Sequence, residues 1–407
     1  MDHEGLKELD SARIAGSYAR SDVSLERGRG AVCWSLDGRR YVDFGSGIGV
    51  NALGYCDPEW VRAVAGQAAL LQHSSNLYYT EPCARLAAAL TERAGLKKAF
   101  FCNSGAEANE AAIKAARKYS FDRHGEGRFE IISLENSFHG RTMAAITATG
   151  QEGFHRFFGP FLDGFRYAPA DDAQGLRELV SERSCAIMIE TVQGEGGVVP
   201  ISAGFADAIA EICAERDILL IADEIQSGIG RTGRFFSYEH FGLRPDIVTA
   251  AKALGGGIPI GAALFGEKCE GVFGPGDHGS TFGGNPVACA GGLVVLDRID
   301  DAFLGRVRDK SALISGRLAA MPGVTDVSGL GLMLGAGLAE GLDAKEIAAA
   351  CAREGLLLLT AKERLRLLPP LVINEDEIGE GLDILDRVLG DAKSCAVKGK
   401  EFPCGLK

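Results

Sequence analysis

An aspartate and a lysine each follow a short apolar run in the middle of the chain. The run 218–221 leads into Ala222 and Asp223, and the run 246–250 leads into Ala251 and Lys252. Lys252 stands among alanine, leucine and glycine with no local ion partner, so desolvation would lower its pKa, as amine attack on a carbonyl requires. Taken singly, Asp223 reads as a helix cap or a loop carboxylate, and Lys252 as a surface lysine. Together they predict a catalytic site at two strand ends.

A third strand end predicts an anion site. The run 99–102 is followed by Asn103, Ser104, Gly105 and Ala106, which open a strongly helical stretch. Free N–H groups and the helix dipole attract a phosphate there, and Ser104 adds a hydroxyl, although Ser-Gly is also a plain N-cap. The glycine-rich segment 279–286, which contains Ser280 and Thr281, either supplies a second hydroxyl contact or is an ordinary loop.

Two other patterns carry no prediction of function. Residues 228–233 match GxGxxG, but they do not join a strand directly to a helix as a dinucleotide site requires. The seven histidines lack the HExxH spacing and the eleven cysteines form no CxxC pair, so we expect no metal site.

Alternating strands and helices must position these side chains. Apolar runs at 99–102, 129–134, 185–190, 217–223, 246–250 and 260–265 predict buried strands, with helices such as 106–123 and 204–216 between them. This order predicts an α/β fold with a mainly parallel sheet between helices, and ligands at the carboxyl ends of the strands.

The two ends of the chain follow a different pattern. Short alternating runs at 31–36 and 40–44, helices at 312–320 and 344–354 and strands near Leu356 and Leu365 predict a small α+β domain from residues 1–60 and 311–393. Residues 61–310 are then the large cofactor-binding domain. Residues 394–407 have little to bury and are expected to be disordered.

Composition sets the class of protein. A chain of 407 residues with net charge -12 would repel nucleic acid and anionic membranes, so we expect small-molecule substrates. Scattered cysteines, and the lack of a signal peptide or an apolar stretch of membrane-spanning length, predict a cytoplasmic protein with reduced thiols.

The motifs together resemble one family over nearly the whole chain. The chain is similar to the fold-type I, pyridoxal-phosphate-dependent class III aminotransferases of the ornithine and acetylornithine group. The matching segments are residues 103–110, 138–142, 193–197, 223–228, the Lys252 segment and 280–286. The resemblance implies a large domain with a mainly parallel sheet, a smaller α+β domain and a homodimer with shared active sites.

The resemblance also implies roles for the cofactor residues. Lys252 would bind pyridoxal 5'-phosphate covalently and then move the proton, while Asp223 would keep the pyridine nitrogen protonated. Gln226 would bond the phenolic oxygen and Phe138 would stack on the ring. The phosphate would lie against Ser104, Gly105 and Ala106, and Thr281 would reach it from the partner subunit.

Substrate residues follow from the same resemblance. Arg141 and Arg366 would bind carboxylates, with Ser280 nearby, and Glu195 would neutralise Arg366 while a distal amine donor is bound. Ile48 stands where ornithine-specific members carry a tyrosine, and Tyr18 is typical of the acetylornithine branch. We therefore expect transfer of the distal amino group of N2-acetylornithine to 2-oxoglutarate. Succinyl-diaminopimelate, succinylornithine or ornithine as donor, an aminomutase, and a non-catalytic binding or regulatory relative remain alternatives.

Overall fold

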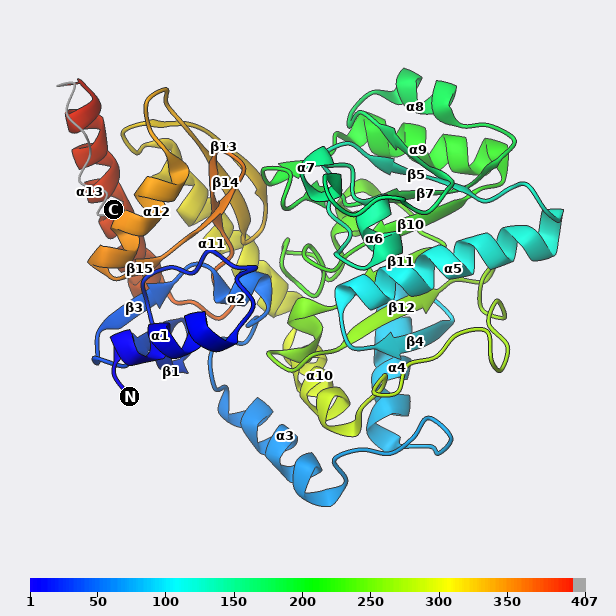
Figure 1. Cartoon of the computed structure of the whole chain (residues 1–407), viewed down its shortest axis with the longest axis horizontal. Helices are drawn as coiled ribbons and strands as arrows, with labels where there is room; N and C mark the ends of the chain where they lie inside the picture. The colour runs from blue at the N-terminus through cyan, green and yellow to red at the C-terminus, as the bar shows by residue number, and fades with distance from the viewer. Residues whose placement is uncertain (398–407) are drawn as a thin grey trace.

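The computed structural model describes residues 1–397 as two groups of elements (Figure 1). One group surrounds a large sheet and occupies the right of the view; the other brings together the blue N-terminal and the orange-red C-terminal segments. No helix within residues 1–397 has the length and apolarity needed to cross a membrane.

The large sheet has seven strands in the order β4-β12-β11-β10-β7-β5-β6. All neighbours are parallel except β12, which runs antiparallel to both β11 and β4. The predicted α/β fold with a mainly parallel sheet is therefore confirmed. Its strands are β4 (Lys98–Cys102), β5 (Glu130–Leu134), β6 (Phe165–Ala168), β7 (Ser184–Ile189), β10 (Leu219–Asp223), β11 (Ile247–Ala250) and β12 (Gly261–Phe265).

Helices cover both faces of this sheet, which is why every residue of β7, β10, β11 and β12 is buried. On one face α5 (Gly105–His124) lays a row of alanines against the strands, and these small side chains let the helix approach closely. On the other face α9 (Ala203–Arg216) buries Phe205, Ile209 and Ile212. The remaining helices of this group are α3 (Pro58–Leu70), α4 (Glu81–Ala94), α6 (Met143–Ala148), α7 (Glu152–His155), α8 (Ala173–Leu179) and α10 (Pro286–Arg298).

The second group joins the two chain ends in one sheet, because β15 pairs in parallel with β3 through Leu356 and Val42. A further antiparallel sheet has the order β13-β14-β17-β16. The strands are β1 (Leu25–Arg29), β2 (Val32–Ser35), β3 (Arg40–Asp43), β13 (Val324–Leu330), β14 (Met333–Leu338), β15 (Leu356–Leu357), β16 (Leu359–Ala361) and β17 (Arg364–Leu367). The helices are α1 (His3–Arg13), the short α2 (Ser46–Gly49), α11 (Asp301–Ala319), α12 (Ala344–Glu354) and α13 (Glu375–Val397). The remaining elements are the strands β8 (Val192–Gln193) and β9 (Val199–Pro200) and the 3-10 turns η1 (Ser237–Phe241) and η2 (Lys252–Gly255).

Two predicted boundaries differ from the structure. The helix expected at 312–320 begins at Asp301, because the side chain of Asp300 caps it at the N–H of Phe303. The expected boundaries at 60 and 311 thus fall inside α3 and α11, and the division into domains stays a prediction. Disorder from Ser394 is wrong for residues 394–397, because α13 continues past the buried Ala392 to Val397. Residues 398–407 lie outside the described part of the chain.

Candidate active site

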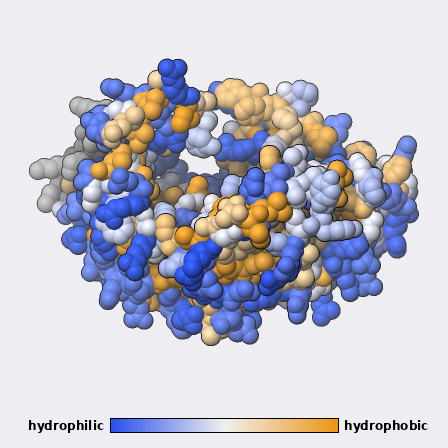
Figure 2. Space-filling model, turned by 90° about the horizontal axis from the view of Figure 1, so that it is seen from below, coloured by the Kyte–Doolittle hydropathy of each residue, from blue (hydrophilic) through white to orange (hydrophobic). Residues whose placement is uncertain are grey.

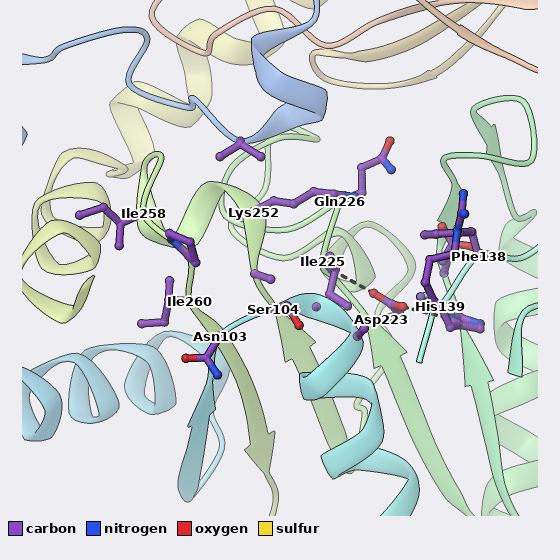
Figure 3. A pocket seen from close by; sticks show the side chains of 18 of the residues that line it. Asn103, Ser104, Phe138, His139, Asp223, Ile225, Gln226, Lys252, Ile258 and Ile260 are labelled. Atoms are coloured by element: carbon purple, nitrogen blue, oxygen red, sulfur yellow. Dashed lines mark hydrogen bonds and ion pairs between the residues drawn. The ribbon is translucent and has the colours of Figure 1, made fainter. Parts of the chain in front are cut away.

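A cavity of about 430 Å³ lies at the carboxyl ends of β4, β10 and β11 (Figure 3). The three segments singled out from the sequence meet in its wall: the turn at Ser104, the aspartate that ends β10, and Lys252 after β11. They meet because strands that run in one direction in a sheet present their carboxyl ends at one edge.

Asp223 is held rigidly at the base of the cavity. Its side chain is 4% exposed and accepts three hydrogen bonds: from Asn109 Nδ2 (2.8 Å), from His139 Nδ1 (2.7 Å) and from the N–H of Ile225 (3.0 Å). Asn109 is itself fixed, since its Oδ1 accepts a hydrogen bond from Thr249 (2.8 Å). Asp223 therefore presents a buried negative charge whose orientation is fixed before any ligand arrives.

His139 completes this cluster. Burial acts to lower its pKa, but the hydrogen bond and the charge of Asp223 raise the pKa of His139 above its ordinary value. The other ring nitrogen, Nε2, has no hydrogen-bond partner within residues 1–397. A cationic imidazolium would orient the Asp223 carboxylate and balance part of its charge.

Lys252 opens the 3-10 turn η2 directly after β11, with a φ of +43° that non-glycine residues rarely adopt. Its ammonium forms no hydrogen bond or ion pair with any other described residue. Burial lowers the pKa of Lys252, while Glu195 and Asp223 oppose that shift. The result is an amine that loses its proton more easily than a surface lysine and faces the cavity.

The turn before α5 leaves main-chain donors free. Ser104 is the N-cap: its Oγ accepts from the N–H of Glu107 (3.2 Å) and donates to the Glu107 carboxylate (2.9 Å). The side chain thus serves its own helix, while Gly105 and Ala106 supply first-turn N–H groups, which have no partner inside a helix. A Cβ on Gly105 would lie 2.7 Å from Ile225 Cγ2, so only glycine fits there. These free N–H groups of Gly105 and Ala106 form a cradle that suits a phosphate.

Apolar and amide side chains flank the space between cradle and lysine. Phe138 and Ile225 line it, and Phe138 is braced by an edge-on contact with Phe154 at 5.4 Å between ring centroids. Gln226 lies beside them in Figure 3 and is 7% exposed. The cavity can therefore hold a flat ring with a phosphate at one end and a carboxylate partner at the other.

A partly buried ion pair stands next to the cavity. Arg366 on β17 is 4% exposed, and its Nη1 lies 2.5 Å from Glu195 Oε1 and 3.4 Å from Gln226 Oε1. Arg141, in contrast, is exposed and forms no ion pair with the other described residues. Its guanidinium lies 4.5 Å from the Phe154 ring and 5.6 Å from the Phe138 ring. Arg366 is thus neutralised by Glu195, while Arg141 is available to bind a carboxylate.

Six predicted site residues do not line the cavity of this single chain: Glu195 and Arg366, which stand next to it, and the four described below. Ile48 is 42% exposed in a left-handed turn, and Tyr18 is 73% exposed beside Arg20. Thr281 is exposed, while Ser280 Oγ accepts a hydrogen bond from Asn103 Nδ2 (3.3 Å) just behind the cradle. Their roles in substrate or cofactor binding stay predictions.

The sequence reading missed Glu190, which directly follows β7 and lines the cavity. Burial raises the pKa of Glu190 to about 7, although His139 opposes the shift, and its carboxyl accepts from the N–H groups of Phe138 (2.8 Å) and Gly194 (3.2 Å). The signal that identified Asp223, an acid at a strand end, was present here too. Asn109 and His139 lay inside recognised motifs without an assigned role.

Comparison with known proteins agrees with this geometry. Residues 15–389 match the model of the family described as aminotransferase class-III, and the chain belongs to this family. Among its relatives is the acetylornithine aminotransferase of Haemophilus ducreyi, 48% identical over 96% of this chain and 100% of that protein. Among solved structures, the N-acetylornithine aminotransferase of Stenotrophomonas maltophilia is 36% identical, with a TM-score of 0.83 over 95% of this chain and 99% of that one. The ornithine aminotransferase of Toxoplasma gondii, in a structure with partial occupancy of PLP at the active site, is 29% identical with a TM-score of 0.93 over 97% and 96%.

Proposed function

We propose that this aminotransferase uses pyridoxal 5'-phosphate to move the distal amino group of N2-acetylornithine to 2-oxoglutarate, giving N-acetylglutamate 5-semialdehyde and glutamate. The observation that carries the proposal is the single cavity that holds Lys252, Asp223 and the helix cradle together. The donor is supported by the relatives named acetylornithine aminotransferase.

The residues present fit that cofactor. The N–H groups of Gly105 and Ala106 would hold its phosphate, Asp223 would hold the ring nitrogen in its protonated form, and Phe138 and Ile225 would flank the ring. When bound, the cofactor supplies an electron sink for charge that develops at the substrate carbon. Lys252, with its lowered pKa, is the group that would bind the cofactor aldehyde and then carry the proton.

The two arginines would divide the substrates between them. The exposed Arg141 would bind the remote carboxylate of the donor, while the Arg366–Glu195 pair stays closed. A dicarboxylate acceptor would replace Glu195 on Arg366 and so bring its second carboxylate to Arg141. Such an exchange would let one cavity accept two dissimilar substrates in alternating half-reactions.

A homodimer belongs to the same proposal. Large apolar side chains are exposed at Leu70, Leu77, Tyr78, Tyr79 and Phe282, with exposed fractions from 58% to 107%. Figure 2, which views the molecule from the side of α3, shows apolar residues gathered in the middle of that face. A second copy would cover them and bring Thr281 towards the neighbouring cradle. Sedimentation should therefore give twice the chain mass of 42.9 kDa.

The test of function is a donor panel with 2-oxoglutarate as acceptor. N2-acetylornithine should give the highest kcat/KM among acetylornithine, succinylornithine, succinyl-diaminopimelate and ornithine. Turnover that needs no oxo-acid would instead identify an aminomutase, and no turnover with any donor would leave the binding or regulatory alternative. Borohydride treatment of the loaded protein followed by peptide mapping should place the pyridoxyl group on Lys252; a label on any other lysine would contradict the site.

A further inference from the structure

The GxGxxG segment that carried no prediction holds the largest fully buried side chain among the described residues, Arg231. It has 0% exposure, yet no carboxylate lies within 4 Å of it among residues 1–397. Burial lowers the pKa of Arg231 to about 9, and the charge of Asp43 opposes this shift, so the guanidinium remains cationic at neutral pH. A buried cation without an ion pair is costly unless hydrogen bonds compensate for its lost hydration.

Arg231 binds main-chain and hydroxyl oxygens from three distant segments. Its Nη1 donates to the carbonyl oxygens of Leu332 (3.0 Å) and Pro369 (2.5 Å), and its Nη2 to Ser46 Oγ (3.5 Å). Its own carbonyl accepts from the N–H of Leu332 (2.9 Å). The planar fork of arginine allows this simultaneous binding, which the single ammonium of a lysine cannot reproduce.

These contacts surround the strand that carries Arg366. Leu332 directly precedes β14, and Pro369 follows β17 by two residues. The two strands pair with Gly335 opposite Arg366. Ser46 Oγ adds a hydrogen bond to the carbonyl of Leu368 (2.5 Å). Because the two strands are antiparallel, the start of β14 and the end of β17 lie side by side, so Arg231 holds the two strands together at this end of the pair, where Pro369 lies three residues beyond Arg366.

The same residue belongs to the segment that carries Gln226. Residues 223–231 run from the end of β10 past Gln226, whose Oε1 accepts from Arg366 (3.4 Å). Just after Arg231, a Cβ on Gly331 would lie 2.3 Å from the carbonyl carbon of Thr232, so the backbone of this segment touches the backbone of the turn before β14. Arg231 therefore connects the cofactor side of the site to the Arg366 side.

We infer that Arg231 is a positioning residue for dicarboxylate recognition: it sets the place of the Arg366 guanidinium and acts through it, without touching the substrate. The inference rests on the proposed function, in which Arg366 binds the acceptor carboxylate. A residue that only stabilised the core would affect both half-reactions alike. A residue that positions Arg366 affects dicarboxylate binding selectively.

Arg231→Lys tests this with a matched control. Arg128 also donates to main-chain carbonyls, those of Ser184, Arg216 and Asp217. These lie at the amino ends of β7 and β10, at the opposite end of the strands from the cavity. The probe is glutarate, a dicarboxylate that cannot react, titrated calorimetrically into each loaded variant. Arg231→Lys should weaken glutarate about tenfold, about 1.4 kcal/mol, and raise the KM for 2-oxoglutarate similarly. The donor half-reaction should change less than about threefold, and Arg128→Lys should leave both unchanged.

Two further variants separate the possible failures. Arg366→Ala must weaken glutarate; if it does not, the acceptor assignment in the proposed function is wrong. If Arg366→Ala weakens glutarate and Arg231→Lys does not, or if Arg231→Lys slows both half-reactions equally, the positioning inference is wrong. Ser46→Ala removes one contact of the same network and should weaken glutarate about two- to fourfold. If Arg231→Lys does not fold, Ser46→Ala becomes the test. An unchanged affinity of the Ser46→Ala variant for glutarate then overturns the inference.

Discussion

Replacing Glu195 by glutamine should move the two half-reactions in opposite directions. The change keeps the size of the side chain and removes the charge that faces Arg366 at 2.5 Å. With charge centres about 4 Å apart and an effective dielectric of about 20, the pair is worth about 4 kcal/mol. The 27% exposure of Glu195 and the desolvation of both groups reduce this to about 1.5–2 kcal/mol. A dicarboxylate must break the pair, so Glu195→Gln should bind glutarate roughly ten- to thirtyfold more tightly.

Single-turnover spectroscopy with each amino donor measures the other consequence. The glutamate half-reaction should be retained or faster, because Arg366 is already available to the second carboxylate. The acetylornithine half-reaction should slow, because the unpaired Arg366 captures the donor carboxylate in an unproductive pose. Glu380→Gln, which breaks the exposed pair with Arg40 far from the cavity, is the control and should change neither. Equal losses in both half-reactions, or unchanged glutarate affinity, would refute the reasoning.

Three other predictions follow from the site. Because burial lowers the pKa of Lys252, the unfolded chain binds more protons between that lowered pKa and 10.5. Cofactor-free Lys252→Met should therefore be more stable than the parent protein at neutral pH, by a margin that shrinks as pH rises towards 10.5; a urea-denaturation margin independent of pH would contradict this. Asp223→Asn should slow turnover roughly 10²–10⁴-fold and lower the pKa of His139, measured by NMR titration, since burial is then opposed only by the weaker effect of Glu190; an unchanged pKa of His139 would show that another group sets its charge. The kcat/KM for N2-acetylornithine should exceed that for ornithine by roughly ten- to a thousandfold, about 1.4–4 kcal/mol, and Ile48→Tyr should narrow the gap by improving ornithine; a preference for free ornithine would overturn the donor but not the chemistry.

The local sequence pattern was sufficient to predict a site residue where that residue directly follows a buried strand. Asp223 and Lys252 could be predicted for that reason, and the cavity brings them together. The direction of β12 could not be predicted, since a short apolar run has the same pattern whether the strand pairs in parallel or antiparallel. The strand β6 was missed because three of its four residues are only partly buried and one is an arginine.

Arg231 could not be identified from a local sequence pattern. Its partners Ser46, Leu332 and Pro369 lie about a hundred or more residues away in the chain. Two of these contacts go to carbonyl oxygens, which every residue type possesses. No spacing rule therefore distinguishes this arginine from a solvated one, and only the folded arrangement reveals it.

The pairing of β3 with β15 sets an order of events during synthesis. Val42 leaves the ribosome more than 300 residues before its partner Leu356 exists. At typical elongation rates the N-terminal strands wait roughly 15–60 s with one edge unpaired. An unpaired edge recruits other strands, so this interval is when the nascent chain is most exposed to misassociation. We expect the large sheet, whose strands all lie between residues 98 and 265, to form first and the terminal sheet to close last. Production of active enzyme should accordingly depend on chaperones that shield the N-terminal segment until translation ends.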